Sequence, residues 1–497
     1  MSEEKKEYQQ VFKATSLFGG VQLIQIIISI LKTKVVALFL GPSGMGVYRL
    51  LQTTVDMVGK LTDFGLPTSA VKYISFEFAK GNEEKAYRYI QILQNLLWIT
   101  GILGAVVLML ASPFLSKLLF DSQTYTYAFI WLGSAVLFNQ LANGRISILQ
   151  SLRRLSQLAK ANLWGSAIGL ILIAPLYYFF GEEAIVPAII LAAGINVYFS
   201  WFYLTKNRIP KIKISPKESY TEGKGMLKLG IVLSFTSLTK ALSLYLLQLY
   251  INEVGGVGQV GLYSAGFLIL ETYGGLIFTA MTKDYYPRLA GVAMDESKVR
   301  ETVKHQAFIA VLLMLPVIAL FLTLAPQLIR LLLSAEFIVI VQMVSWGIIG
   351  LLFKAVAWSI SYIMVAKGHS RIFAITDISF IVVQLGVFAL GYYLGGLTGL
   401  GISYLLYYVI YLIGIYWINH RQYKFYFTRD FYVIFLICIA FCVAIFGLSF
   451  IENPLWHYAS MSVLTLLSIW FAVVQLNKKI DFKELVDSFL SKRNSKK

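Results

Sequence analysis

Long apolar stretches alternate with short polar segments along almost the whole chain. A helix that crosses a bilayer needs about 20 mostly apolar residues. Fourteen stretches reach that length, near 15–40, 45–68, 89–111, 124–144, 161–180, 184–204, 229–252, 260–282, 306–326, 337–365, 372–394, 397–418, 431–451 and 455–476. Turn-like sequences separate several neighbours, at 41–44 (GPSG), 181–183 (GEE), 255–259 (GGVGQ), 395–396 (GG) and 452–454 (ENP). The pattern predicts an all-α polytopic membrane protein with about 14 transmembrane helices.

Lysine and arginine are distributed unevenly among the connections between these stretches. With the N-terminus placed in the cytoplasm, 35 of the 43 Lys and Arg residues fall in the predicted cytoplasmic segments and two fall in outer loops. Enrichment of positive charge on the cytoplasmic side sets the orientation of a membrane protein. Both termini are therefore predicted to be cytoplasmic. The remaining six basic residues lie within spans: Lys32, Lys34, Arg49, Lys60, Lys240 and Lys354.

The composition supports a membrane protein and argues against several other classes. Hydrophobic residues make up 58% of the chain and charged residues 14%, whereas soluble domains carry about 25% charge. The net charge of +17 is explained by membrane orientation and anionic lipid, so no nucleic-acid partner is predicted. Neither a P-loop nor an HExxH or GxSxG motif is present. The spacing of Cys438 and Cys442 places both on one helix face, where a packing role is predicted and not a metal site. No cofactor and no enzymatic activity are predicted.

The chain divides into two similar halves. The basic segment 206–228 is predicted to be a cytoplasmic linker between an N-lobe (1–205, six spans) and a C-lobe (229–418, six spans), and 419–497 holds the last two spans and a cytoplasmic tail. At an offset of 215 residues several positions correspond: Gly46 with Gly261, Tyr48 with Tyr263, Asp56 with Glu271, Gly59 with Gly274 and Gln25 with Lys240. Corresponding spans of the two halves are six spans apart, so both halves cross the membrane in the same direction. We therefore expect pseudo-symmetric lobes around a central cavity, related by an axis along the membrane normal.

Polar residues of the second span form a stripe along one helix face. Arg49, Gln52, Thr53, Asp56, Lys60 and Asp63 fall within about 100° of the helix circumference. In the first span Gln25 and Lys32 lie on one face. Because charges that face lipid are costly, these faces are expected to line protein or water. Two interpretations are open: a hydrophilic cavity, or a helix contact that neutralises itself through an i, i+4 pair of Asp56 with Lys60.

Two lysines lie near the middle of their spans, Lys240 in the seventh and Lys354 in the tenth. Neither has an acidic residue within four positions. Such lysines suit an anion-binding site inside the membrane. The alternative is a tertiary pair with Glu271 or Asp377. Glu271, also mid-membrane, can carry a proton, bind a cation or pair with Lys240.

Two segments resemble a known transporter family. The run KVVALFLGPSGMGVYRLLQTTVDMVGKLTDFGLPTSAVKYIS (34–75) is similar to the start of Wzx-type polysaccharide flippases, the O-antigen translocases of the multidrug/oligosaccharidyl-lipid/polysaccharide exporter (MOP) superfamily. The segment VGQVGLYSAGFLILETY (257–273) resembles the eighth-helix motif of the same family. The resemblance implies that the chain moves an undecaprenyl-pyrophosphate-linked oligosaccharide across the bacterial inner membrane by alternating access.

The resemblance also implies which residues contact the substrate. In this family cationic cavity residues are thought to engage the pyrophosphate. The positions carried over to this chain as substrate-binding are Lys240, Lys354, Lys60, Arg49, Lys32 and Gln25. Apart from the resemblance, Asp56 and Glu271 are candidates for coupling a proton or sodium gradient to transport, and the alternative is that removal of the product on the far side drives flipping. Expected partners are the lipid-linked oligosaccharide, the bilayer and the polysaccharide polymerase or ligase that acts next.

Two other functions compete with this interpretation. A cation-coupled drug exporter of the same superfamily would favour an acidic, aromatic-lined pocket, and the surplus of intramembrane cations argues against it. A membrane glycosyltransferase, ligase or polymerase would carry sizeable outer loops, whereas the outer loops predicted here are short.

Overall fold

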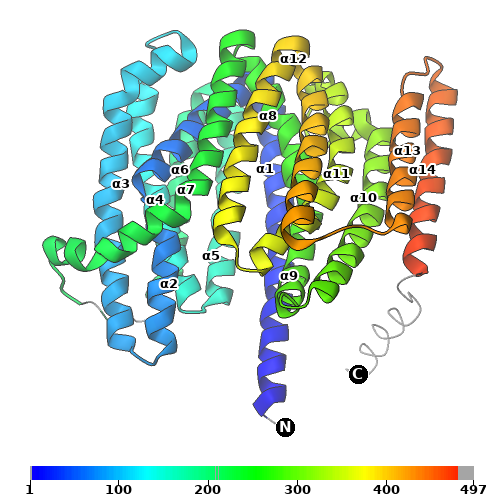
Figure 1. The fold of residues 1–497 in the computed structure, drawn as a ribbon. Coiled ribbons are helices and arrows are strands. Elements are labelled where there is room, and N and C mark those ends of the chain that lie inside the picture. Colours follow the sequence, from blue (N-terminus) through cyan, green and yellow to red (C-terminus); the bar gives the residue numbers. More distant parts are fainter. Residues whose placement is uncertain (1–2, 208, 211, 479–497) are drawn as a thin grey trace, which may run out of the picture. The chain divides into compact units, whose positions relative to one another are not determined.

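The computed structural model describes residues 3–207, 209–210 and 212–478, with the side chains from Ile24 onward except those of Pro216, Ala280 and Lys283. Every regular element within these residues is a helix (Figure 1). The elements are α1 (Glu3–Thr62), α2 (Leu66–Ala79), α3 (Glu83–Phe120), α4 (Thr126–Ser151), α5 (Leu155–Phe180), η1 (Gly181–Ala184), α6 (Ile185–Thr205), α7 (Pro216–Gly255), α8 (Val257–Phe267), η2 (Leu268–Tyr273), α9 (Gly275–Gly291), α10 (Glu296–Leu332), η3 (Ala335–Ile340), α11 (Val341–Ala366), α12 (Ser370–Tyr423), α13 (Arg429–Leu448) and α14 (Pro454–Asn477).

The described residues contain ten helical segments long and apolar enough to cross a membrane. Two of them, 155–205 and 370–423, each contain two predicted spans, and 24–62 covers most of two more. The predicted span 124–144 corresponds to α4, which is not among the ten. The predicted all-α membrane class is confirmed, while the count of fourteen crossings stays a prediction.

The predicted turns divide the longest helical segments. In α1 the backbone leaves the helix at Gly41, where φ is 61°. In α12 it does so at Gly395 and Gly396, and φ of Gly396 is 55°. Left-handed backbone of this kind favours glycine, because a Cβ atom would clash there. The turn at 181–183 becomes the short helix η1, which joins α5 to α6.

The chain forms two compact units. The first unit runs to Ser264 and includes Leu332–Glu336, and the second holds Ala265–Leu331 and the chain from Phe337 onward. This boundary falls inside α8, whereas the sequence predicts a lobe boundary in the linker 206–228. In the first unit α7 packs against α1, α2 and α3. The division into an N-lobe of six spans and a C-lobe of six spans stays a prediction.

The first unit packs around an apolar core that adjoins the buried amide of Gln140. The core is built from α2 to α6 together with Met226 of α7. Beside it Gln140 of α4 is only 4% exposed. Its Nε2 donates to Thr62 Oγ1 at 2.7 Å and to the Gly59 carbonyl at 3.3 Å, and its Oε1 accepts from Thr100 Oγ1 at 3.0 Å. All three bonds hold α1 and α3 to α4, so the amide is satisfied within the protein.

In the second unit α11 packs against α12, α9 and α13, and α13 packs against α14. The N-cap of α10 is Asp295, which lies before the apolar part of that helix. The Ser297 hydroxyl and the backbone N–H groups of Lys298 and Ser297 donate to its carboxylate, and they lower the pKa of Asp295 to about 2.

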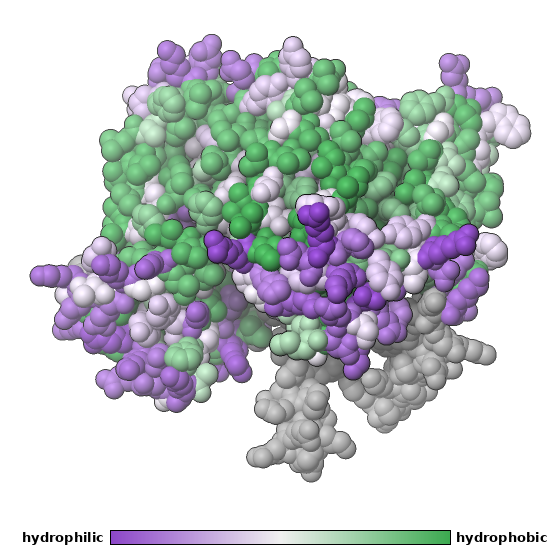
Figure 2. All heavy atoms as spheres, viewed as in Figure 1, coloured by the Kyte–Doolittle hydropathy of each residue, from purple (hydrophilic) through white to green (hydrophobic). Residues whose placement is uncertain are grey.

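In Figure 2 hydrophobic residues cover the middle of the visible helices, and hydrophilic residues gather at their ends, as expected for helices that cross a bilayer.

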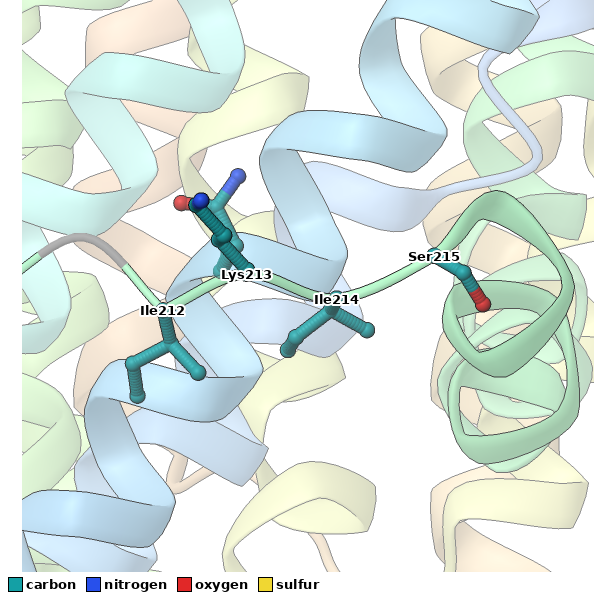
Figure 3. A pocket seen from close by; sticks show the side chains of 5 residues that line it. Ile212, Lys213, Ile214 and Ser215 are labelled. Carbon is teal, nitrogen blue, oxygen red and sulfur yellow. The ribbon is translucent and has the colours of Figure 1, made fainter.

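The predicted linker leads into α7 through an extended segment beside α3 (Figure 3). Ile212, Lys213, Ile214 and Ser215, together with Gln91 of α3, line a shallow pocket of about 470 Å³. Ser215 begins α7 with a reciprocal cap, because its hydroxyl accepts from the Glu218 N–H at 3.2 Å and its own N–H donates to Glu218 Oε2 at 2.9 Å. The first turns of α7 are therefore fixed at one end of the first unit.

Replacement of Ser215 by Ala removes one half of this cap. We expect a loss of about 1 kcal/mol of local stability, which corresponds to roughly five-fold faster hydrogen exchange in the first turn of α7. Hydrogen-exchange mass spectrometry on the full chain in detergent measures this exchange rate. Thr221→Ala is the matched control, because the Thr221 hydroxyl bonds only the Lys217 carbonyl of its own helix. Equal exchange in both variants would contradict the capping role.

Candidate functional site

A polar cavity of the first unit is open to its surroundings, since Asn143, Ser166 and Asn196 in its lining are exposed. It has a volume of about 320 Å³ and lies among α1, α4, α5 and α6. Six polar side chains line it: Gln25, Asn139, Asn143, Asn162, Ser166 and Asn196. The spacing explains the arrangement, because positions four apart on one helix share a face and α4 and α5 each contribute such a pair.

Three apolar residues complete the lining of this cavity. Ala142, Ile146 and Ala161 are its apolar lining. A Cβ atom at Gly165 would stand 2.5 Å from Asn196 Oδ1, so the glycine leaves room for that amide. Among the residues whose side chains the structure describes, no charged side chain lines the cavity.

The polar stripe of α1 is partly bonded within the first unit. Gln52 Nε2 donates to Asp56 Oδ1 at 3.0 Å. The Thr53 hydroxyl lies 2.7 Å from Gln248 Oε1, and the Thr54 hydroxyl lies 3.3 Å from Tyr245 OH. Because Tyr245 and Gln248 belong to α7, the stripe faces the seventh predicted span over part of its length.

Four predicted substrate-binding cations lie in the first unit: Lys32, Arg49, Lys60 and Lys240. In the described part of this unit, none of them forms a salt bridge within 4.0 Å. The direct Asp56–Lys60 pair considered from the sequence is therefore not formed. The Arg49 guanidinium lies 5.7 Å from the Tyr48 ring centroid, and its Nε is buried with no hydrogen-bond partner in the described structure. The side chains of Lys60 and Lys240 are exposed.

The second unit contains an intramembrane ion pair. Lys354 Nζ of α11 lies 2.8 Å from Glu271 Oε2, and the two side chains are 16% and 39% exposed. Glu271 Oε1 accepts from Tyr404 OH at 2.8 Å and from Tyr408 OH at 3.0 Å, both on α12. The ammonium group also lies 5.1 Å from the Tyr408 ring centroid. Of the two interpretations of Lys354, the structure shows the tertiary pair, and its partner is Glu271.

Glu271 occupies an irregular turn of its helix. Residues Leu268–Tyr273 form the π-helical segment η2, in which the Gly274 N–H donates to the Ile269 carbonyl five residues earlier. Turns of this kind are rare and are frequent at functional sites. A Cβ atom at Gly274 would lie 2.5 Å from Leu351 Cδ1 of α11, so the glycine permits close packing beside the ion pair.

Sequence reasoning missed the amides of the cavity and the two tyrosines that bond Glu271. Polar residues four apart within otherwise apolar spans, Asn139 with Asn143 and Asn162 with Ser166, were the available signal. Tyr404 and Tyr408 have the same spacing, but aromatic residues are common in membrane helices and their partner is distant in sequence. Gln25, in contrast, was predicted as substrate-binding and lines the cavity.

The predicted repeat corresponds to a reciprocal contact between α1 and α8. A Cβ atom at Gly46 would collide with the Val257 carbonyl, and one at Gly261 would collide with the Pro42 carbonyl. Val257 follows Pro42 by 215 residues, the same offset that separates the two glycines. The two repeat segments thus cross backbone to backbone about a local two-fold axis.

The sequence has recognisable relatives. Residues 35–342 match the family of polysaccharide biosynthesis proteins. The lipid III flippase of Escherichia coli (strain K12) is 22% identical over 378 residues, which cover 74% of this chain and 88% of the relative. A putative O-antigen transporter of Shigella flexneri is 23% identical over 421 residues, which cover 82% of this chain and 96% of the relative.

Solved transporter structures share the fold. The lipid II flippase MurJ in an inward closed conformation has a TM-score of 0.71 at 12% identity, covering 93% of this chain and 99% of that structure. An inward-facing MATE family multidrug resistance transporter of the MOP superfamily has a TM-score of 0.67 at 17% identity, covering 80% and 94%. The chain therefore belongs to the polysaccharide biosynthesis protein family and has the MOP-superfamily fold, as its resemblance to polysaccharide flippases predicts.

Proposed function

We propose that this chain is a flippase of lipid-linked polysaccharide precursors, and that its substrate is an undecaprenyl-pyrophosphate-linked oligosaccharide. It is a transporter that works by alternating access in a bacterial inner membrane, with both termini in the cytoplasm. The observation that carries the proposal is a set of intramembrane cations in the first unit, Lys32, Arg49, Lys60 and Lys240, which have no carboxylate within 4.0 Å among the described residues. Family membership and the flippase names of its relatives support it.

The charges suit a diphosphate that is bound and then released. A cation without a carboxylate partner attracts an anion, and the attraction is stronger where the cation is partly buried, as Lys32 and Arg49 are, than where it is exposed. Lysine acts on phosphate as a point charge and Arg as a planar fork. We propose that Lys240, Lys60, Lys32 and Arg49 contact the diphosphate, with Gln25 beside them, while the polyprenyl chain stays in lipid.

The Lys354–Glu271 pair is proposed to couple substrate binding to the uptake of a proton or a cation. A diphosphate that draws Lys354 away from Glu271 leaves the carboxylate to take up a proton or a cation. Glu271, and Asp56 at the corresponding position of the repeat, are thus the proposed coupling residues. A polysaccharide polymerase or ligase would consume the translocated product.

The test is the loss of translocation in Lys240→Ala. A charge-assisted hydrogen bond is worth about 1.5–3 kcal/mol, so we expect a fall of about ten-fold or more in outward transfer of the lipid-linked oligosaccharide. The oligosaccharide accumulates on the inner leaflet of a bacterial strain that depends on this chain. Lys224→Ala, an exposed lysine earlier in α7, is the matched control. If the Lys240→Ala and Lys60→Ala variants both produce normal amounts of surface polysaccharide at normal protein levels, the proposal is contradicted.

A further inference from the structure

Five polar side chains of the first-unit cavity, all except Gln25, are not used by the proposed diphosphate interaction. The six polar side chains of the cavity make no hydrogen bond to protein among the residues that the structure describes. Gln140 provides the contrast, since it adjoins Asn139 in sequence and makes three bonds. Amides inside a bilayer-spanning bundle need partners. The cavity amides are therefore available to bind water or a ligand.

The lining selects a neutral, strongly polar ligand. The described lining has no cation to balance a phosphate and no carboxylate to balance a metal or an organic cation. Each amide presents both donors and an acceptor, and the Ser166 hydroxyl does the same. A sugar ring, whose hydroxyl groups donate and accept in turn, matches such a lining. The volume of about 320 Å³ lies at the lower end of the range for small-molecule sites.

We propose that this cavity binds the saccharide part of the lipid-linked substrate, an assignment that rests on the proposed function. The geometry of α1 supports it. Lys32 follows Gln25 by seven residues, which places the two side chains on the same helix face about 10 Å apart along the axis. A diphosphate held near Lys32 would thus have its first sugars within reach of Gln25. Cations hold the charged link, and the amide cavity selects among sugars.

The experiment separates the two parts of the substrate. One probe is the oligosaccharide released by mild acid from the lipid fraction of cells that lack this chain, labelled with a fluorophore at its reducing end. The other is farnesyl diphosphate, which has no sugar. Binding of each to the full chain in lipid nanodiscs is measured for wild type, Asn143→Leu, Asn196→Leu and the double variant. Gln150→Leu is the matched control, because Gln150 is exposed on α4 and does not line the cavity.

We expect the double variant to lose about ten-fold or more in affinity for the oligosaccharide, with the affinity for farnesyl diphosphate unchanged. Retained binding of farnesyl diphosphate also shows that the variant is folded. Unchanged oligosaccharide binding in the double variant would overturn the cavity assignment while leaving the flippase proposal standing, and the amides would then hold water only. If cells without the chain accumulate no lipid-linked oligosaccharide, both proposals fail.

Discussion

Replacement of Lys354 by Met is expected to destabilise the second unit by about 2–3 kcal/mol. Removal of one member of a fully buried ion pair costs about 3–5 kcal/mol, because the remaining charge has no partner. The expected value here is smaller, since the Glu271 side chain is 39% exposed and keeps the Tyr404 and Tyr408 hydroxyls as donors. Glu271→Gln alone should also destabilise, since it leaves the ammonium group unpaired.

A double-mutant cycle measures the interaction between the two side chains. Unfolding of Lys354→Met, Glu271→Gln and the double variant is followed in one detergent, and the double variant should lose less than the sum of the single losses. Lys298→Met is the control, because its pair with Asp295 is 3.4 Å long and solvent-exposed, and such pairs are worth about 0–1 kcal/mol. Strictly additive losses at Lys354 and Glu271 would show that the pair contributes no coupling.

Gly46→Ala and Gly261→Ala are each expected to destabilise the first unit by about 1–3 kcal/mol, because the added methyl group forces two backbones apart. The two variants should lose similar amounts, since each added Cβ would meet the carbonyl on the opposite side of one two-fold contact. Combining them should cost less than the sum, because the first substitution already separates the helices.

Gly258→Ala provides the matched control on the same helix. A Cβ atom there would lie 3.5 Å from Ser43 Oγ, an ordinary contact, and alanine is favoured over glycine in a helix by about 1 kcal/mol. Thermal unfolding of the three purified variants and their ability to restore surface polysaccharide are the two measurements. A Gly261→Ala variant as stable and as active as Gly258→Ala would contradict the close crossing of the two repeat segments.

The amino-acid sequence by itself determined the helical membrane class and the position of the turns. In a bilayer the backbone must satisfy its hydrogen bonds within the chain, so a long apolar run can only be a helix. Gly41 and Gly396 mark breaks in α1 and α12 because their left-handed backbone is a local property of glycine. The offset of 215 residues is likewise visible in the sequence, and it corresponds to the crossing of Gly46 and Gly261.

The tertiary structure alone decided which polar groups meet. Helical spacing shows that Lys354 has no local partner, but only the packing of η2, α11 and α12 brings Glu271 and two tyrosines to it. Spacing also fails to distinguish Gln140 from Asn139, since both lie within one apolar span. The Gln140 amide makes three hydrogen bonds within the protein, whereas Asn139 lines a cavity. The physical reason is that periodicity fixes the direction of a side chain on its own helix, whereas its partner depends on which distant helix packs there.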